Sequence, residues 1–442
     1  MSRERPLLVP AKPGAQLVHL RFDEALIEAR EQDTIATALI AAGALMTSRS
    51  PKYRRPRGAY CLGGDCGTCL VRVDGRPNVR ACVTPVREGM RVSSQNSYKP
   101  KRLDPTALVD VLFPGGIDHH HLLVRPRIAN QVMQELARNL TGFGELPSDV
   151  DERQHEHVEH TLPVLIIGAG SAGRAAADVL ARAGVEHAIV DRHDRAQLDA
   201  NLEFNQPKPE RLRSSTGVFG IYPGPRLELA GHEEDRALVA ASELCDGTER
   251  LHVFRPQQLI LAVGSRDPML PFRNDDLPGI VSARGLIRAL RRADARIHGR
   301  CIVVGEGPWA NAQRDALDGL RSPEAPSVEL VAASEIERAV GGERIEALEC
   351  RGGKLSCALL AVAAPPAAAH ELAAQADLPL RFDGSGFAIV READGRCGTL
   401  GGTTIWATGD ACGFVGSAAA ARDGQRVAKA VLATLQPAEP SP

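Results

Sequence analysis

The spacing of apolar residues changes along the chain and divides it into regions. Between residues 16 and 100 the apolar segments are short. "LVHLRF" and "LIEARE" alternate apolar and polar residues, which predicts two strands paired as a hairpin. "TIATALIAAGA" follows Asp33, a plausible N-cap, and stops at Gly43, which predicts one helix. We therefore expect this region to be small and mostly β.

A second region, from Leu162 onward, has a different pattern. Apolar strands alternate with alanine-rich helices, which is typical of a doubly wound α/β fold. Between the two regions, "RIANQVMQELARNL" predicts a helix, and the polar run at 144–160 has no hydrophobic period. We interpret residues 105–160 as a helical connector and polar linker that follows a first domain at 1–104.

Four cysteines in the first region have the spacing of a ligand set. They are Cys61, Cys66, Cys69 and Cys82, in the pattern C-x4-C-x2-C-x12-C, with glycines between the first three. The pattern begins with the plant-type [2Fe-2S] spacing, and glycines let backbone N–H groups approach the sulfurs. Zinc sites usually contain two separate C-x2-C pairs, whereas only Cys66 and Cys69 form one here. The pattern favours a [2Fe-2S] cluster, with zinc and purely structural cysteines as the alternatives.

Composition and charge exclude some classes of function. The 442-residue chain has a net charge of -2 and 4% aromatic residues, so we expect no nucleic acid partner. The N-terminal "MSRERPLLVPAKPGAQ" lacks the apolar core of a signal peptide. The most apolar stretch, "ALLAVAAPPAAAHELAA", is too short for a membrane span and is interrupted by Pro365 and Pro366. We expect a cytoplasmic protein with reduced thiols, where clustered cysteines indicate metal or redox chemistry.

The segment "VLIIGAGSAGRAAADVLARAGVEHAIVDR" has the parts of a dinucleotide-binding fingerprint. An apolar strand leads into a G-x-G-x-x-G turn, a helix follows, and a second strand ends at Asp191. Gly168 permits the turn, Gly170 lets the backbone reach a pyrophosphate, and Gly173 lets helix and strand touch. Asp191 can bond a ribose hydroxyl. The predicted cofactor contacts in this segment are Gly168, Gly170, Ala172, Gly173, Asp191 and Arg192.

Two further segments indicate that the cofactor is a flavin. "TTIWATGDACGFVGSAAAARDGQRVAKAVLATL" places Gly409 and Asp410 between a short strand and a helix, which resembles the second flavin motif of flavoproteins with two dinucleotide-binding domains. In those proteins the aspartate bonds the ribityl chain, and the alternative is that Asp410 is an ordinary helix cap. "LILAVGSRDPMLPF", which contains Gly264, resembles the strand and turn that join their FAD and NAD regions. We therefore expect FAD.

A second glycine-rich turn lies between these two segments. "GRCIVVGEGPWANAQRDAL" has the pattern Gly305-x-Gly307-x-x-Ala310 after an apolar strand and resembles the nicotinamide half of the same flavoproteins. The next strand ends without an acidic residue for a ribose, and Glu306 would face an anion. We predict a vestigial Rossmann unit in place of a working site for NAD or another adenine nucleotide. The α/β half then divides into an FAD-binding Rossmann domain at 161–268, an inserted NAD-like domain at 269–383 and a returning FAD-binding segment at 384–436.

Together these motifs resemble one family of flavoenzyme subunits. "TSRSPKYRRPRGAYCLGGDCGTCLVRVDGRPNVRACVTPVREGMRVSSQN", the later "FPGG" and the α/β half are similar to the α subunit of heteromeric sarcosine oxidase. They are also similar to its relatives, the opine oxidases, hydrogen cyanide synthases and D-hydroxyproline or proline dehydrogenases. The resemblance implies an α/β protein in which an N-terminal β-grasp ferredoxin-like domain precedes a tandem Rossmann flavoprotein fold with two dinucleotide-binding domains. It also implies that the four cysteines hold the cluster and that the two flavin motifs hold FAD.

The resemblance further implies a division of labour between subunits. In this family a glycine-oxidase-type β subunit removes two electrons from an amine or amino acid at its own FAD, with or without further small subunits. We therefore predict an electron-transfer subunit of a heteromeric amine or amino-acid dehydrogenase or oxidase, of the sarcosine, proline or opine type. No substrate base stands out in the α/β half, so no catalytic residue is assigned. A free-standing NAD(P)H-dependent reductase and a scaffold subunit without flavin are the alternatives.

Three details refine this expectation. The basic "KYRRPRG" beside Cys61 is interpreted either as a segment that orients a partner or as a solvated arginine run. Relatives usually carry a Pro-Gly-Gly loop after the acidic residue, whereas Asp191 is followed by "RHDRAQLDANLEFNQPKPERLRSSTGVFG", which predicts an altered pocket around the flavin ring. The sequence stops soon after the last helix, so the folate-binding half of tetrameric sarcosine oxidase is not expected.

Overall fold

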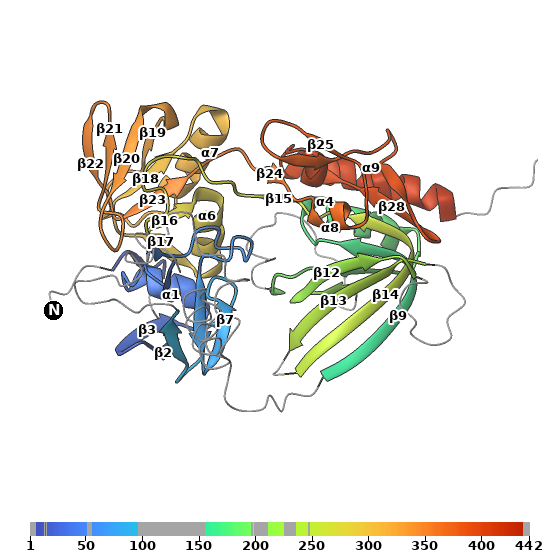
Figure 1. The fold of residues 1–442 in the computed structure, drawn as a ribbon, viewed down its shortest axis with the longest axis horizontal. Helices are drawn as coiled ribbons and strands as arrows, with labels where there is room; N and C mark the ends of the chain where they lie inside the picture. Colours follow the sequence, from blue (N-terminus) through green and yellow to red (C-terminus); the bar gives the residue numbers. More distant parts are fainter. Residues whose placement is uncertain are drawn as a thin grey trace, which may run out of the picture. The chain divides into compact units, whose positions relative to one another are not determined.

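The chain forms two compact units. Figure 1 shows the ribbon of the chain, coloured by residue number from blue to red. Unit 1 contains residues 1–150 and 269–364, and unit 2 contains residues 151–268 and 365–442. The structure, a computed structural model, describes residues 6–12, 14, 16–50, 55–95, 155–195, 198, 211–224, 236–245 and 248–435. The helix predicted from "RIANQVMQELARNL" and most of the predicted linker lie outside these residues. None of the described helices is long and apolar enough to cross a membrane.

The N-terminal part of unit 1 is a small mixed sheet with one helix. Its five strands have the spatial order β3-β2-β8-β6-β7. The predicted hairpin is confirmed, because β2 and β3 pair antiparallel along their whole length. Alternate residues of β2 are buried, as the alternation in "LVHLRF" requires. The elements are β2 Leu17–Phe22, β3 Ala25–Arg30, α1 Ile35–Ala41, β4 Ser48–Arg49, β5 Pro56–Arg57, β6 Leu70–Val73, β7 Arg76–Arg80 and β8 Arg91–Ser94.

Helix α1 has a different N-cap from the one that the sequence suggested. The cap is Thr34, whose hydroxyl accepts the Thr37 N–H, while Thr37 Oγ1 accepts the Thr34 N–H. Asp33 is buried and binds the N–H and the guanidinium of Arg30. Because the buried Arg30 charge needs a counter-charge, the neighbouring hydroxyl caps the helix instead. The predicted stop at Gly43 is confirmed, and the φ of that residue is 76°.

The remainder of unit 1 is a parallel sheet with the order β16-β23-β18-β19, followed by an antiparallel sheet with the order β20-β21-β22. Strand β1 (Leu8–Pro10) of the N-terminal part pairs with β17 (Ala295–Ile297), so the two parts are joined by a ladder. One continuous hydrophobic core contains residues of both parts. The other elements are β16 Ile280–Ser282, α6 Ala283–Arg292, β18 Cys301–Val304, α7 Gly307–Asp318, β19 Glu329–Val331, β20 Ile336–Val340, β21 Ala347–Cys350, β22 Gly353–Ser356 and β23 Leu359–Val362.

Unit 2 is built on an eight-stranded sheet. Its strands have the order β11-β10-β9-β14-β13-β12, with β28 beside β14 and β27 beside β28. Helices α4 and α9 pack on the face of β9 that carries Val164 and Ile166, whereas α8 packs on the opposite face. The elements are β9 His155–Ile167, α4 Ser171–Arg182, β10 His187–Val190, β11 Leu212–Arg213, β12 Thr216–Tyr222, β13 Leu238–Cys245, β14 Thr248–Leu261, β15 Ser265–Arg266, β24 Ala367–Ala368, α8 Glu371–Gln375, β25 Leu380–Phe382, β26 Phe387–Ile389, β27 Arg396–Leu400, β28 Thr403–Ala407, η4 Gly409–Cys412 and α9 Ser417–Leu435.

Residues 155–160, which the sequence assigned to a linker, are the first half of strand β9. They pair residue by residue with β14. The strand has no apolar period here because its side chains make polar contacts across the ladder. Arg250 Nε donates to Glu156 Oε2 at 2.5 Å, and His160 Nε2 lies 3.0 Å from His252 Nδ1. Cross-strand polar pairs stabilise a sheet without the alternation that sequence patterns detect.

The chain returns to unit 2 at residue 365, which is earlier than the expected return at 384. Strand β24 pairs antiparallel with β15, which also belongs to unit 2, so the returning segment joins this unit as soon as it leaves unit 1.

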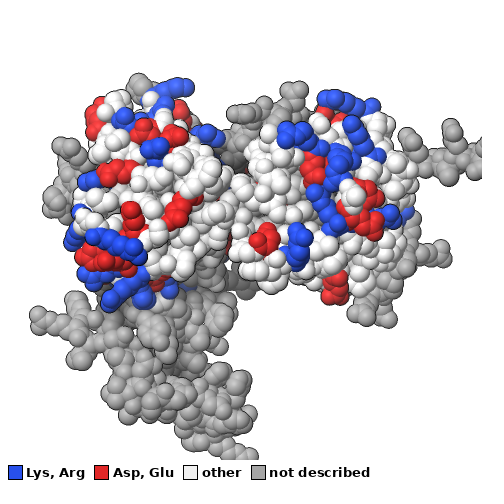
Figure 2. All heavy atoms as spheres, turned by 90° about the horizontal axis from the view of Figure 1, so that it is seen from above, with Lys and Arg blue, Asp and Glu red and all other residues white. Residues whose placement is uncertain are grey.

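Charged side chains of both signs lie next to one another on the face drawn in Figure 2. Among the described residues, this face therefore has neither a continuous basic nor a continuous acidic surface.

Candidate cofactor sites

The loop between β5 and β6 surrounds the sulfur of Cys61. The N–H groups of Gly63, Asp65 and Cys66 lie 3.5, 3.2 and 3.4 Å from Cys61 Sγ. Gly64 has a φ of 84°, which lets the backbone reverse within the loop. Three N–H donors directed at one sulfur stabilise its thiolate, which is the form that binds iron.

The four cysteines predicted as ligands converge in this part of the chain. Cys61 shares hydrogen bonds with Cys66 and Cys82, and Cys82 also contacts Cys69. These hydrogen bonds lower the pKa of Cys61 below its usual range. Three of the four side chains are buried, whereas Cys66 is exposed. The thiols therefore form a chain of contacts with one exposed end.

This donor set fits the predicted two-iron cluster. Four thiolates that accept N–H hydrogen bonds are the ligands of [2Fe-2S] centres. A structural zinc needs its ligands arranged tetrahedrally around one point. The convergence of the four thiols, with N–H groups directed at Cys61 Sγ, therefore agrees with the predicted cluster.

Two arginines of the basic segment beside Cys61 are held inside unit 1. Arg55 Nη2 lies 2.6 Å from Asp276 Oδ1, and Arg57 binds the other oxygen of the same carboxylate. Asp276 belongs to the NAD-like part, so these ion pairs join two parts of the chain. Arg55 and Arg57 therefore form ion pairs within unit 1, and whether the segment orients a partner stays a prediction; residues 52–54 of the segment lie outside the described residues.

The first glycine-rich turn has the backbone geometry that its sequence predicted. Gly168 has a φ of 104°, and a Cβ there would lie 2.2 Å from the Ala262 carbonyl oxygen. A Cβ on Gly173 would lie 1.9 Å from the Gly168 carbonyl oxygen, so α4 can approach the strand only with glycine there. Gly170 precedes α4, and a Cβ there would meet nothing within 4 Å. The turn is packed on its inner side and open at the start of α4, where helical N–H groups are available to an anion.

Asp191 follows β10 as predicted, and its carboxylate is bound to the protein. Oδ2 accepts the Ala169 N–H at 2.7 Å, and Oδ1 accepts the His193 N–H and contacts His193 Nδ1, both at 2.8 Å. Burial alone would raise the pKa of Asp191, but hydrogen bonds from His193 and Ala169 outweigh burial and lower the pKa. Asp191 thus fixes the glycine-rich turn, and its oxygens keep acceptor capacity for a further donor such as a ribose hydroxyl.

A cavity of about 300 Å³ opens beside this turn. It lies at the carboxyl ends of the parallel strands β9, β10 and β14, where open α/β sheets bind nucleotides. Gly168, Asp191, Arg192 and Arg266 line it, and Arg266 forms an ion pair with Glu371 at its edge. The cavity therefore offers charged side chains of both signs and room for part of a dinucleotide.

The second flavin motif forms η4 and the turn that leads into α9. Asp410 Oδ1 accepts the N–H groups of Val415 and Gly416 at 3.0 and 3.1 Å. Its Oδ2 accepts the Ser265 hydroxyl at 3.3 Å. Ser265 follows Gly264, so the structure brings together the two segments that the sequence linked to a flavin. Asp410 orders the turn before α9 but is not an N-cap of that helix, and its contact with a ribityl chain stays a prediction.

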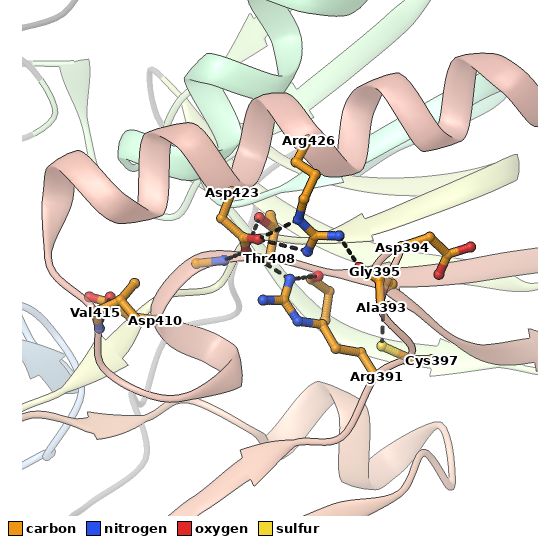
Figure 3. A network of polar contacts seen from close by, with 12 residues as sticks. Arg391, Ala393, Asp394, Gly395, Cys397, Thr408, Asp410, Val415, Asp423 and Arg426 are labelled. Atoms are coloured by element: carbon orange, nitrogen blue, oxygen red, sulfur yellow. Dashed lines mark hydrogen bonds and ion pairs between the residues drawn. The ribbon is translucent and has the colours of Figure 1, made fainter.

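Asp423 of α9 is a central residue of this region that sequence reasoning missed (Figure 3). Its Oδ2 accepts the Gly409 N–H at 2.8 Å and the Thr408 hydroxyl at 2.8 Å, and it also binds Arg391 Nη1 at 2.7 Å. Its Oδ1 binds Arg426 at 2.7 Å. Burial alone would raise the pKa of Asp423, but the hydrogen bonds, first that of Arg391, outweigh burial and bring it to about 2. The carboxylate thereby ties α9 to the Thr408-Gly409 turn.

A sequence signal for Asp423 exists. The buried residues Ala420, Gly424 and Val427 mark the inner face of α9. Asp423 lies three residues after Ala420 and four before Val427, so helical periodicity places an acidic residue on a core-facing position. An acid at such a position requires buried partners.

The second glycine-rich turn carries an acidic side chain where an anion would bind. Glu306 precedes α7, and its Oε1 accepts the N–H and the hydroxyl of Ser334 at 2.9 and 2.7 Å. These hydrogen bonds lower the pKa of Glu306, which keeps the carboxylate charged. Ser334 follows β19, where a nucleotide-binding unit would place its ribose-binding acid. The predicted doubt about this second nucleotide site therefore has a physical basis: a fixed negative charge lies at the helix start.

Comparison with known domain families identifies both cofactor regions. Residues 15–97 match a 2Fe-2S iron-sulfur cluster binding domain, and residues 161–200 match an FAD binding domain. The first match contains all four predicted cysteine ligands, and the second contains the first glycine-rich turn and Asp191. The predicted 2Fe-2S and FAD-binding domains are confirmed.

Curated relatives are subunits of two kinds of enzyme. The α subunit of sarcosine oxidase from Rhizobium meliloti is 30% identical over 294 residues, which are 61% of this chain and 30% of that subunit. Hydrogen cyanide synthase subunit HcnA from Pseudomonas aeruginosa is 39% identical over 88 residues, 20% of this chain and 82% of that subunit. Subunit HcnB from the same organism is 31% identical over 159 residues, 33% of each chain. The chain belongs to the family of sarcosine oxidase α subunits and hydrogen cyanide synthase subunits. It spans less than a third of the length of the sarcosine oxidase subunit that it matches.

The fold of this family member also occurs in a solved structure. The L-proline dehydrogenase from P. horikoshii superposes with a TM-score of 0.67 over 98% of this chain and 76% of that one, at 18% identity. The predicted fold class, an N-terminal ferredoxin-like domain followed by a Rossmann-type flavoprotein fold, is confirmed.

Proposed function

We propose that this chain is the electron-transfer subunit of a heteromeric flavin-dependent amine or amino-acid dehydrogenase or oxidase. When bound, FAD takes electrons in pairs and a [2Fe-2S] cluster carries them singly, so a chain that binds both can connect two-electron chemistry to a one-electron path. The observation that carries the proposal is the loop with three N–H groups directed at Cys61 Sγ, in a chain that also has an open nucleotide turn beside a cavity.

In this proposal Cys61, Cys66, Cys69 and Cys82 are the cluster ligands. Three of them are buried and Cys66 is exposed. The buried ligands exclude water from most of the site, and exposed Cys66 marks the side of the loop that a redox partner can approach. The N–H groups around Cys61 compensate negative charge on the sulfur.

The same proposal assigns the FAD contacts to unit 2. The open start of α4 at Gly170 would receive the pyrophosphate, with Arg192 and Arg266 supplying positive charge in the cavity. Asp191 holds the turn in place and can accept a ribose hydroxyl. The Gly409 and Asp410 turn would face the flavin end. Asp423 holds the shape of this turn by accepting the Gly409 N–H.

The partner in this proposal is a glycine-oxidase-type β subunit with its own FAD. The support is that the relatives are named as subunits of sarcosine oxidase and hydrogen cyanide synthase. The donor would then be a secondary amine or amino acid of the sarcosine, proline or opine type. The nine cysteines whose side chains the structure describes are free thiols, which suits the reducing cytoplasm that we propose as the location.

The test is to purify the full-length chain alone and together with a co-expressed β subunit of this type. We expect the isolated chain to contain iron, acid-labile sulfide and FAD, and to oxidise no amine with an artificial dye as acceptor. The complex should oxidise at least one of sarcosine, proline, hydroxyproline or an opine. Amine turnover by the isolated chain would contradict the subunit assignment. Rapid bleaching of its flavin by NADH would favour the reductase alternative instead.

A further inference from the structure

Helix α6 of the NAD-like part lies directly against the cysteine loop. The Ser282 N–H donates to the Tyr60 carbonyl at 2.8 Å, and the Ser282 hydroxyl caps α6 by accepting the Gly285 N–H at 3.0 Å. A Cβ on Gly285 would lie 2.2 Å from the Cys61 carbonyl oxygen. Glycine at this position therefore lets the first turn of α6 touch the cysteine whose sulfur the loop encloses.

The same face of α6 brings a positive charge to the loop. Arg288 lies three residues after Gly285, which is about one helical turn. A Cβ placed on Gly63 would lie 3.2 Å from Arg288 Nη2 and 3.5 Å from Asp65 Oδ2. Gly63 and Asp65 are two of the residues whose N–H groups point at Cys61 Sγ. Arg288 therefore stands beside the segment that surrounds this sulfur.

Packing fixes the orientation of α6 on the loop. Leu286 and Leu290 of α6 belong to the same hydrophobic core as Cys69 and Cys82. Ion pairs connect the same two parts of unit 1 and are formed by Arg49 with Glu343 and by Arg55 and Arg57 with Asp276. A shared core and several ion pairs hold a helix more rigidly than either would alone.

We propose that α6 is a positioning helix for the iron-sulfur cluster and that Arg288 raises the reduction potential of the cluster. The inference rests on the proposed function in one respect, that the four cysteines hold a [2Fe-2S] cluster. Reduction adds one negative charge to such a centre, so a guanidinium beside it favours the reduced form. Without Arg288, less positive charge would compensate the negative charge of the Asp65 carboxylate beside the cluster loop. The NAD-like domain thus serves the cluster through α6, and this role needs no nucleotide.

The charge is tested by the midpoint potential of the full-length protein, measured by electron paramagnetic resonance during a dithionite titration. Arg288→Met should lower the ratio of reduced to oxidised cluster about tenfold at a given potential, which is about 59 mV for one electron. Arg288→Lys keeps the charge and should stay close to the unmodified protein. Arg291→Met is the matched control, because it removes the same charge from an exposed position of the same helix and should not shift the potential.

Other outcomes also decide the question. An unchanged potential in Arg288→Met, with a full cluster, contradicts the role of Arg288. If Arg288→Met loses iron, recovery of iron in Arg288→Lys supports a requirement for the positive charge. Failure of Arg288→Lys to recover iron contradicts that requirement and indicates a general packing defect.

The positioning role of α6 is tested separately at Gly285. Gly285→Ala should reduce iron and acid-labile sulfide per chain and broaden the resonance signal, because the new Cβ displaces the Cys61 carbonyl. Gly319→Ala at the end of α7 is the control, since a Cβ there would meet its nearest atom at an ordinary 3.5 Å. Equal cluster content and equal spectra in both variants would overturn the positioning role.

The inference and the proposed function fail in different ways. Unmodified protein that contains no iron and no sulfide contradicts the assignment of the four cysteines. Unmodified protein with a full cluster, whose potential ignores Arg288 and whose content ignores Gly285, contradicts only the role of α6.

Discussion

The two glycine-rich turns share a sequence pattern and differ at the start of the helix that follows. In unit 2 the position before α4 is Gly170, which a side chain could occupy without a contact, and the acid Asp191 binds back to the turn. In unit 1 the position before α7 is Glu306, whose carboxylate is fixed by Ser334. The comparison teaches that glycines determine the shape of such a turn, whereas the charge at the helix start makes anion binding there more or less favourable.

The turns also differ in what their domains contact. The first belongs to the sheet that forms the cavity. The second belongs to the domain whose α6 covers the cysteine loop. If the predicted vestigial site is correct, the proposed support of the cysteine loop by α6 gives this Rossmann unit a role that needs no nucleotide.

The largest expected effect comes from adding one methyl group at the glycines of the two turns. Gly173→Ala should destabilise unit 2 by about 3 kcal/mol or more, because its Cβ would lie 1.9 Å from a backbone carbonyl oxygen. Gly305→Ala should cost about 1–2 kcal/mol, since its nearest contacts are 2.8 and 2.9 Å. Gly170→Ala should change stability little. Urea unfolding measures the free energy of unfolding of the three variants. An equal loss of stability in all three would show that the close contacts do not control stability.

The next effect contrasts Asp423, the half-buried acid of unit 2, with Glu306, the exposed acid of unit 1. The folded-state pKa of Asp423 is about 2, below its ordinary value of 3.8. Its stabilisation is therefore complete above pH 3.8, is lost as the pH falls towards 2, and amounts to about 2 kcal/mol. Asp423→Asn should remove this part of the pH dependence of unfolding. Glu306→Gln should leave it unchanged, and a similar change in both variants would contradict the network in Figure 3.

A smaller effect concerns cofactor retention. Asp191→Asn weakens the hydrogen bond from the Ala169 N–H. The affinity of the protein for FAD should therefore fall about tenfold, which is a loss of ~1.4 kcal/mol of binding free energy. Glu306→Gln should not alter FAD content. Flavin released by denaturation, measured per chain after dialysis, gives the comparison. Equal losses of FAD from the two variants would contradict the prediction that FAD binds at the first turn and not at the second.

The smallest expected effect is at the second turn itself. Glu306→Ala removes a negative charge from the start of α7, and such a charge changes anion binding by ~0.3–1 kcal/mol. We therefore expect NADH to bind only about two- to fivefold more tightly than in the unmodified protein. Fluorescence titration with NADH measures this change. Tight binding in the variant would show that Glu306 alone blocks an otherwise working site.

Local patterns anticipated much of the fold because they depend on near neighbours. The β2–β3 hairpin, the stop of α1 at Gly43 and the first glycine-rich turn all form where alternation, a helix stop and glycine spacing predicted them. These features require only a few consecutive residues. The predictions failed where a distant partner intervened. Asp33 pairs with buried Arg30 and leaves the cap to Thr34, and residues 155–160 join the sheet because β14 lies beside them.

The sequence by itself determined the ligand types, their spacing and the two turns, because chemistry and backbone geometry at these positions are local properties. Tertiary structure alone decided which groups meet across long separations. It placed Asp423 on the Gly409 turn and Gly285 of α6 on the Cys61 carbonyl. These contacts depend on how whole elements pack, and packing balances burial, charge and hydrogen bonds over the entire core. The spacing of residues along the chain does not show how that balance is resolved.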